Sequence, residues 1–142
     1  FMTRNRFDAI KSSLLAACGD VSKSLSDKWW GIRPLFDGFN DNRRRVVVAS
    51  KEKIPDEIMS AFRPRTTPTG DLPSISFVKR KPKNLGSEAK SVADGRHGLM
   101  LFLEIQEGKE AMALKRHRAK FAPATAMALR LAEGVRGVQF DI

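Results

Sequence analysis

The strongest constraint on the fold is a turn segment at residues 94–98 (DGRHG), which separates two strand-like runs at residues 88–93 and 99–105. An Asp-Gly pair followed by a second glycine supplies the positive backbone torsions that a tight turn requires. We therefore expect the two runs to pair as an antiparallel β-hairpin.

Apolar residues at helical spacing predict helices on both sides of this hairpin. The first helix covers about residues 4–18. A second begins near Pro34, because proline is tolerated in the first turn of a helix. An alanine-rich third helix is expected at about residues 123–132, where Pro123 suits its beginning and Gly134 its end.

Three further segments have strand character, at residues 51–58, 74–78 and 135–140. Pro55 lacks the N–H group that a β-ladder uses, which suits an edge strand, a bulge or a strand end. The order is two helices, then a strand, hairpin strands, a helix and a strand. This order predicts an α/β fold with a mixed sheet.

The charge of the chain narrows the class of partner. The 142 residues include 26 Lys and Arg but only 16 Asp and Glu, which gives a formal net charge of +10. A surface of this kind favours polyanions, above all nucleic acid, although ribosomal, chromatin and membrane-surface proteins share the property. No run of 18 apolar residues occurs, so we expect no transmembrane helix.

The basic residues gather in clusters, at residues 43–45, 79–83 and 115–120. Such clusters contact nucleic-acid phosphates or act as nuclear import sequences, and they also occur in solvated loops. Three clusters in one small chain strengthen the DNA-binding interpretation. The candidate DNA-binding residues are Lys79, Arg80, Lys81, Lys83, Lys90, Lys115, Arg116 and Arg118.

Two aspartates form the candidate metal site. Asp56 is expected late on the first strand, and Asp141 at the end of the strand that follows the crossover helix. If these strands are sheet neighbours, both carboxylates can hold magnesium or manganese, which prefer oxygen ligands and support phosphodiester chemistry. Aspartates near strand ends are common in α/β domains, so a structural or solvated role is the alternative. Glu57 points to the opposite face from Asp56 and suits a salt bridge with a nearby arginine.

The sequence lacks the residue patterns of several other common functional sites. His97 and His117 have no histidine or cysteine partner at a spacing typical of metal sites. The chain has no phosphate-cradling glycine loop, no nucleophile elbow and no Cys/His nucleophile pair.

Several motifs occur together in one order: an RNRF segment at residues 4–7, IRPL at 32–35, DEIM at 56–59, and Lys81-Pro82 followed by Gly86 and Lys90. In this combination the chain resembles the piggyBac-type DNA transposases. The resemblance implies a helical region at residues 1–49 and a partial ribonuclease-H-like catalytic core at residues 50–142, truncated at its C-terminus. The order of elements predicted from local patterns agrees with that topology.

The resemblance also implies a site and its partners. Members of the family cut and join DNA with three metal-binding aspartates, of which Asp56 matches the first. The segment at residues 138–141 matches the approach to the second, Asp141, although Ile142 departs from the family pattern. The third has no counterpart, so we expect no activity from the chain as written. The implied cofactor is Mg²⁺, the implied partners are DNA and a second copy of the chain, and the implied location is the nucleus.

Three hypotheses follow. The chain is a transposase-derived domain that has lost activity, a non-catalytic basic DNA-binding module, or a gene fragment without an independent role.

Overall fold

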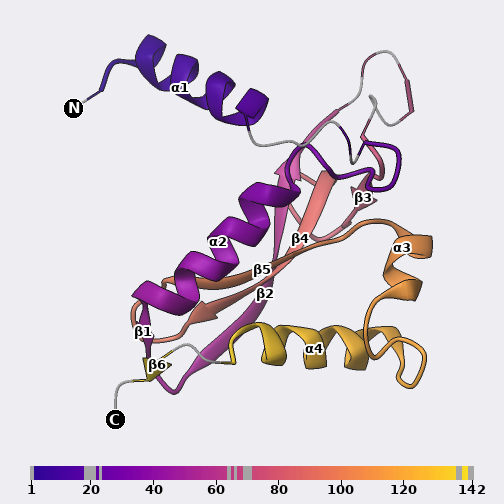
Figure 1. Ribbon diagram of the computed structural model, residues 1–142. Coiled ribbons are helices and arrows are strands. Elements are labelled where there is room, and N and C mark those ends of the chain that lie inside the picture. The colour runs from indigo at the N-terminus through magenta and orange to yellow at the C-terminus, as the bar shows by residue number, and fades with distance from the viewer. Residues whose placement is uncertain are drawn as a thin grey trace. The chain divides into compact units, whose positions relative to one another are not determined.

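The computed structural model describes residues 2–17, 22, 24–63, 65, 67–68, 72–136 and 139–140. The chain divides into two compact units, Phe1–Gly38 and Phe39–Ile142. Within the described residues the fold is mixed α/β, with helices and a small antiparallel sheet (Figure 1). It confirms the predicted fold class and is compatible with an incomplete ribonuclease-H-like fold. The domain boundary predicted at residues 49/50 stays a prediction.

The first unit contains helix α1 (Arg4–Ala17) and the turn that leads into α2 (Arg33–Val46). Asp27 organises this turn, because its carboxylate accepts hydrogen bonds from the Trp29 N–H at 2.9 Å and from Arg33 Nη2 at 2.8 Å. Pro34 occupies the first turn of α2, where its missing N–H costs no helical hydrogen bond. Both helices were predicted from apolar spacing.

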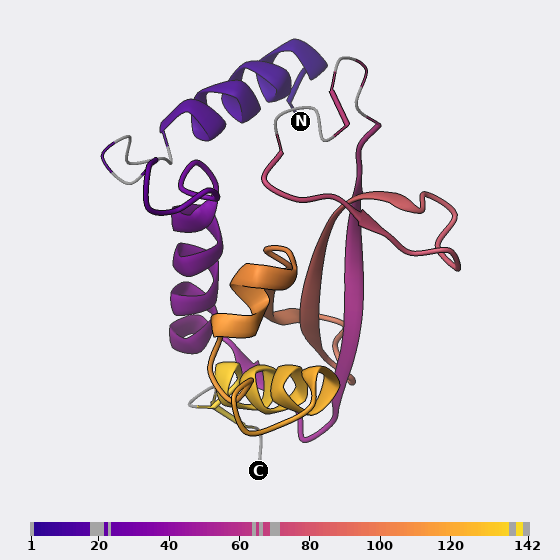
Figure 2. The ribbon, with the colours of Figure 1, turned by 90° about the vertical axis from the view of Figure 1, so that its right-hand side faces the viewer.

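The main sheet is built around β4 (Leu85–Asp94). β2 (Lys53–Ala61) pairs antiparallel with it along its length, and Figures 1 and 2 show the two as long neighbouring strands. β3 (Ser76–Phe77) and β5 (Met100–Ile105) pair with its other edge, near opposite ends. The predicted hairpin of β4 and β5 is therefore confirmed.

Pro55 lies in an edge strand, as its sequence position allowed. The Gly95 N–H donates to Glu52 O, and the Phe62 N–H donates to Leu85 O. These two bonds show which residue pairs of the β2–β4 ladder are hydrogen-bonded and which are not. By the alternation of an antiparallel ladder, Pro55 falls in a pair without hydrogen bonds, opposite Val92. Its ring nitrogen therefore faces the outer edge of β2, where no N–H is needed.

Gly86 allows β2 and β4 to approach closely at the far end of the ladder. Its φ is +154°, and a Cβ atom there would lie 2.0 Å from Ser60 O and 2.8 Å from Phe62 N. Only a residue without a side chain fits this gap.

Side chains of α2 cover the outer edge of β5. The Asn40 amide donates to Leu103 O at 2.9 Å and accepts from Leu103 N at 2.9 Å, as a neighbouring strand would. Arg43 Nε donates to Met100 O one turn later. These contacts satisfy backbone groups that an open sheet edge would expose.

A second, smaller sheet joins β1 (Val48–Ala49) to β6 (Gln139–Phe140) in parallel. The candidate metal site depended on the strand leading to Asp141 lying beside the strand of Asp56, and the observed pairing differs from that condition. β6 pairs instead with Val48 and Ala49, which precede β2. One edge of β2 is taken by β4, and Pro55 offers no N–H to a new strand on the other.

The core lies where β1, β5 and the end of α4 (Pro123–Gly134) meet. Val47, Ala49 and Leu101 are buried together, with Val135 packed against them. Figure 2 shows α4 crossing the ends of the long strands. A short helix, α3 (Lys109–Leu114), precedes α4 and was not predicted, because its six residues give too little periodicity.

Candidate functional site

Asp56 lies in the middle of β2 rather than late on it, opposite Ser91 of β4. Its side chain is 63% exposed, and Lys81 Nζ lies 3.9 Å from Oδ1. The Ser91 hydroxyl donates to the backbone O of Asp56 at 3.2 Å, which leaves the carboxylate itself free of that bond. Asp56 is therefore an accessible carboxylate with a cation beside it.

The described residues around Asp56 do not form a magnesium site. Asp141, the predicted second ligand, lies outside the described residues. Within the described part of the chain no group of three or more His, Cys, Asp or Glu side chains is placed to hold a metal ion. A single exposed carboxylate beside a lysine ammonium is a poor donor set for a hard divalent cation, which favours several oxygen ligands. The metal-binding role of Asp56 and Asp141 stays a prediction.

Glu57 faces the other side of the sheet, as strand alternation predicts. Its carboxylate is only 12% exposed, accepts a hydrogen bond from Arg80 and lies 3.2 Å from Lys90 Nζ. The predicted salt bridge with an arginine is confirmed. The two neighbouring acids thus have separate environments, one open to solvent and one enclosed by cations.

Lys90 continues this arrangement across the sheet. It lies opposite Glu57 on one side and Glu104 of β5 on the other, and it also bridges Glu88 at 2.6 Å. Burial lowers the pKa of Lys90, but the hydrogen bonds and charges of Glu88 and Glu57 outweigh it and raise the pKa above its usual value. We call the row Glu57, Lys90 and Glu104 the charge row.

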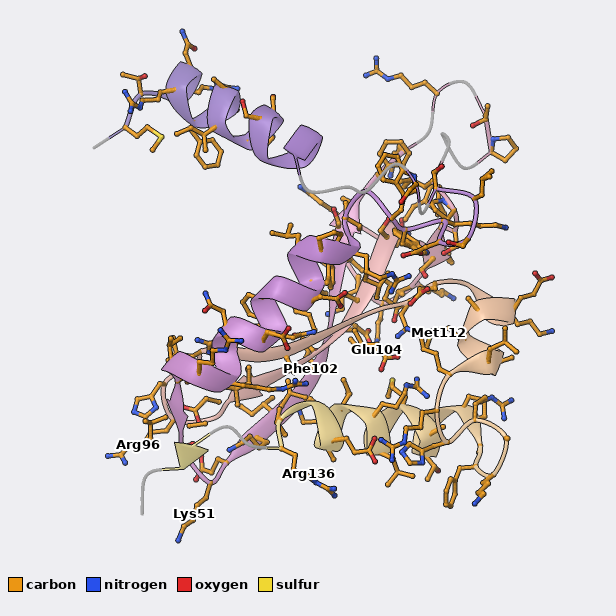
Figure 3. The ribbon with its side chains drawn as sticks, in the orientation of Figure 1. Lys51, Arg96, Phe102, Glu104, Met112 and Arg136 are labelled. Atoms are coloured by element: carbon orange, nitrogen blue, oxygen red, sulfur yellow. The ribbon has the colours of Figure 1, made fainter. Side chains whose placement is uncertain are left out.

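The charge row ends against α4 and the loop after α3. Arg130 holds Glu104 with two hydrogen bonds, both 2.9 Å, and their side chains are 11% and 9% exposed. Lys115 lies 2.8 Å from Glu107 and 3.6 Å from Glu104. Figure 3 shows Glu104 on the part of β5 that faces these elements. Acids and bases alternate, so the interior of this region is nearly charge-balanced.

The candidate DNA-binding residues therefore differ in availability. Lys90, Lys115 and Lys81 are 18%, 21% and 25% exposed, and each lies beside an acid. Arg80 and Arg116 are 69% and 73% exposed, and each has one acidic partner among the described residues.

Three candidates remain. Arg118 is half-buried and donates to Phe121 O at 3.1 Å. Lys79 and Lys83 are exposed and have no acidic partner among the described residues. The DNA contacts stay predictions, and the geometry favours the exposed residues.

A buried aspartate at the hairpin turn was missed by the sequence interpretation, which assigned Asp94 only turn chemistry. Its side chain is fully buried and accepts hydrogen bonds from Ser50 N at 2.8 Å and from the Ser50 hydroxyl. The His97 N–H donates at 3.0 Å, and His97 Nδ1 lies 2.6 Å away. Hydrogen bonds from Ser50, and then from His97, hold the pKa of Asp94 far below its usual range despite burial.

A second histidine contact lies beside α4. His117, a non-glycine residue with φ of 69°, places Nε2 at 3.0 Å from Glu133 Oε1. The close approach of His117, together with the charge of Arg116, lowers the pKa of Glu133 although burial opposes the shift. Each histidine therefore contacts one carboxylate, His97 that of Asp94 and His117 that of Glu133.

Exposed basic residues clustered on one loop are the electrostatic pattern of proteins that bind nucleic acid. The family Transposase IS4 matches residues 1–140. The chain belongs to this family, whose members act on DNA and usually use a divalent metal ion. No curated protein and no solved structure matches the chain. No helix among the described residues is long and apolar enough to span a membrane.

Proposed function

We propose that the chain is a piggyBac-type transposase-derived domain that binds DNA and does not cut it by itself. The observation that carries the proposal is the family match over residues 1–140. The ordered motifs, from the RNRF segment to the DEIM strand, support the piggyBac-type assignment.

DNA binding is supported by the exposed cations of the loop between β3 and β4. Lys79 and Lys83 have no acidic partner in the described structure, so their charge is available to phosphates. Neutralised phosphates release counterions, which makes affinity fall with salt.

Duplex binding is measured by fluorescence anisotropy over a salt series. We expect a steep loss of affinity with salt, and a slope reduced by about one unit for each lysine in Lys79→Gln and Lys83→Gln. Lys109→Gln on α3 serves as an exposed control. Affinity that does not change with salt would sink the DNA-binding proposal.

Lack of cutting is supported by the surroundings of Asp56. The described residues offer one carboxylate with Lys81 beside it, where the family resemblance requires three aspartates. A nicking assay on supercoiled plasmid with added Mg²⁺ should give no product from either the chain or Asp56→Asn. Metal-dependent nicking that disappears in Asp56→Asn would show an active site and contradict the proposal. The predicted ligand role of Asp56 and Asp141 would then be restored.

Location and assembly belong to the same proposal. The exposed basic residues at 79–83 suit nuclear import, and the piggyBac likeness suits a homodimer. A fluorescent fusion should accumulate in nuclei and lose that preference in Lys79→Ala/Lys83→Ala. Light scattering should give twice the chain mass. A diffuse fusion or a monomeric mass would count against each point separately.

A further inference from the structure

A pocket of about 350 Å³ lies between the end of β2 and the loop that joins β3 to β4. Phe62, Pro82 and Leu85 supply its apolar walls. The walls are held together because the Phe62 N–H donates to Leu85 O at 3.0 Å, while the Val78 N–H closes the loop on Asn84 O at 2.8 Å. The volume is near the lower end of small-ligand pockets, about 300 Å³.

Among the described residues, the charged side chains that line the pocket are all positive. Arg63, Lys83 and Asn84 contribute to its lining, and none of the described lining residues is acidic. Arg63 and Lys83 are exposed and have no acidic partner in the described structure. This region therefore differs from the charge row, where every lysine or arginine faces a carboxylate.

We propose that this pocket binds one nucleotide of single-stranded DNA. The base lies between the Phe62 ring and Pro82, the Asn84 amide hydrogen-bonds the edge of the base, and the Arg63 and Lys83 cations bind the adjoining phosphate. Phe62 is 37% exposed, which leaves a ring surface free for stacking. A base inside a duplex is stacked on both faces, so only an unpaired or extruded base can enter.

The chemistry of the walls favours a nucleotide over an acidic peptide. An acidic side chain would satisfy the cations but present no flat ring to Phe62 and Pro82. Aromatic stacking combined with cationic backbone contacts is the pattern by which proteins hold single strands.

The two ends of the pocket lie at different distances from Asp56. Phe62 follows Asp56 by six residues, and an extended strand rises about 3.3 Å per residue, so the Phe62 end lies about 20 Å away along β2. The Pro82 wall lies nearer, because it follows Lys81, whose Nζ lies 3.9 Å from Asp56 Oδ1.

This inference rests on the proposed DNA binding, and its test compares two strands of equal charge. Anisotropy is measured for a labelled oligodeoxythymidylate and for an abasic strand with the same number of phosphates. We expect the intact strand to bind about tenfold more tightly, the effect of one stacked base. Phe62→Ala should abolish the difference, whereas Phe121→Ala, a control at a ring that is 43% exposed, should keep it.

A double substitution, Arg63→Gln/Lys83→Gln, should weaken both strands alike and reduce the salt slope by about 0.7 for each phosphate that is no longer neutralised. Equal affinity of the wild-type protein for the two strands overturns the pocket, even if the Phe62 variant does not fold. If duplex DNA still binds with a salt-dependent affinity, the proposed function survives that result. If no DNA binds at any salt concentration, both proposals fail.

Discussion

In the described structure, the basic residues in the middle of the sheet are paired with carboxylates, whereas those at the loop end of β2 are not. In the charge row, Lys90 bridges Glu57 and Glu88, and Arg130 holds Glu104 with two hydrogen bonds. At the loop end, Arg63 and Lys83 line a pocket without an acid. The positive charge that makes up the net +10 is therefore neutralised in one region and open to a ligand in the other. Cations in the first region stabilise the fold, and those in the second are free to bind a ligand.

The largest expected effect lies in the charge row. Glu104→Gln leaves the nearly buried Arg130 without its carboxylate, and removing one member of a buried pair costs about 3–5 kcal/mol. Urea denaturation followed by circular dichroism measures the change. Glu110→Gln, at an exposed position of α3, should change stability by less than about 0.5 kcal/mol. A loss below about 1 kcal/mol in Glu104→Gln would mean that Arg130 finds another partner or water.

A smaller loss is expected where β2 meets β4. In Gly86→Ala the new methyl group would overlap Ser60 O at 2.0 Å, so a strand must shift, at a cost of about 1–3 kcal/mol. Gly38→Ala is the matched control, because nothing lies within 4 Å of a Cβ atom there. In helix α2 that control should gain up to about 1 kcal/mol. Equal stability of the two variants would contradict the close approach.

The same substitution tests the pocket, because Gly86 adjoins its Leu85 wall. A shift of β4 against Phe62 should reduce the preference for an intact strand over an abasic strand. Duplex affinity should change less, since Lys79 and Lys83 remain exposed. Unchanged strand preference in a destabilised Gly86→Ala protein would separate the pocket from the β2–β4 approach.

The free energy of unfolding should fall at acidic pH partly because Asp94 becomes protonated. Its pKa is lowered in the folded protein, so its stabilising effect is complete above the usual aspartate pKa of about 3.9 and is lost as the pH falls below it. Asp94→Asn should flatten the decline of the free energy of unfolding in this acid range. Glu133 also has a lowered pKa and contributes with the same sign, so Glu133→Gln is the comparison. An unchanged acid profile in Asp94→Asn would exclude Asp94 as its source.

The hairpin and the faces of β2 could be predicted because their determinants are local. Gly98 supplies the positive φ, 66°, expected in the turn at residues 94–98, although Gly95 does not, and strand alternation separates Asp56 from Glu57. The partner of β6 could not be predicted, since two-residue strands carry little pattern and Val48 lies far from Gln139 in sequence. The burial of Asp94 could not be predicted either, because its main partner, Ser50, also lies far away in sequence.

The pocket was equally hidden in the sequence. Phe62 and Lys83 become neighbours only through the bond from the Phe62 N–H to Leu85 O, a pairing that depends on the β2–β4 register. The basic run at residues 79–83 was recognised, but its members could not be ranked. Lys81 is drawn to Asp56 and Arg80 to Glu57, whereas Lys83 remains free in the described structure. That ranking depends on long-range contacts.

The smallest expected effect on stability is that of Arg80→Gln, which tests whether Arg80 belongs to the charge row or to the DNA-binding surface. Arg80 contacts Glu57 at the end of the charge row, yet its own side chain is 69% exposed. An exposed ion pair is worth about 0–1 kcal/mol, so Arg80→Gln should scarcely change the urea midpoint. If Arg80 belongs instead to the binding surface, the same variant should weaken duplex binding and reduce its salt slope by about one unit. A clear loss of stability with unchanged DNA affinity would assign Arg80 to the fold and move the boundary between the regions to Lys83.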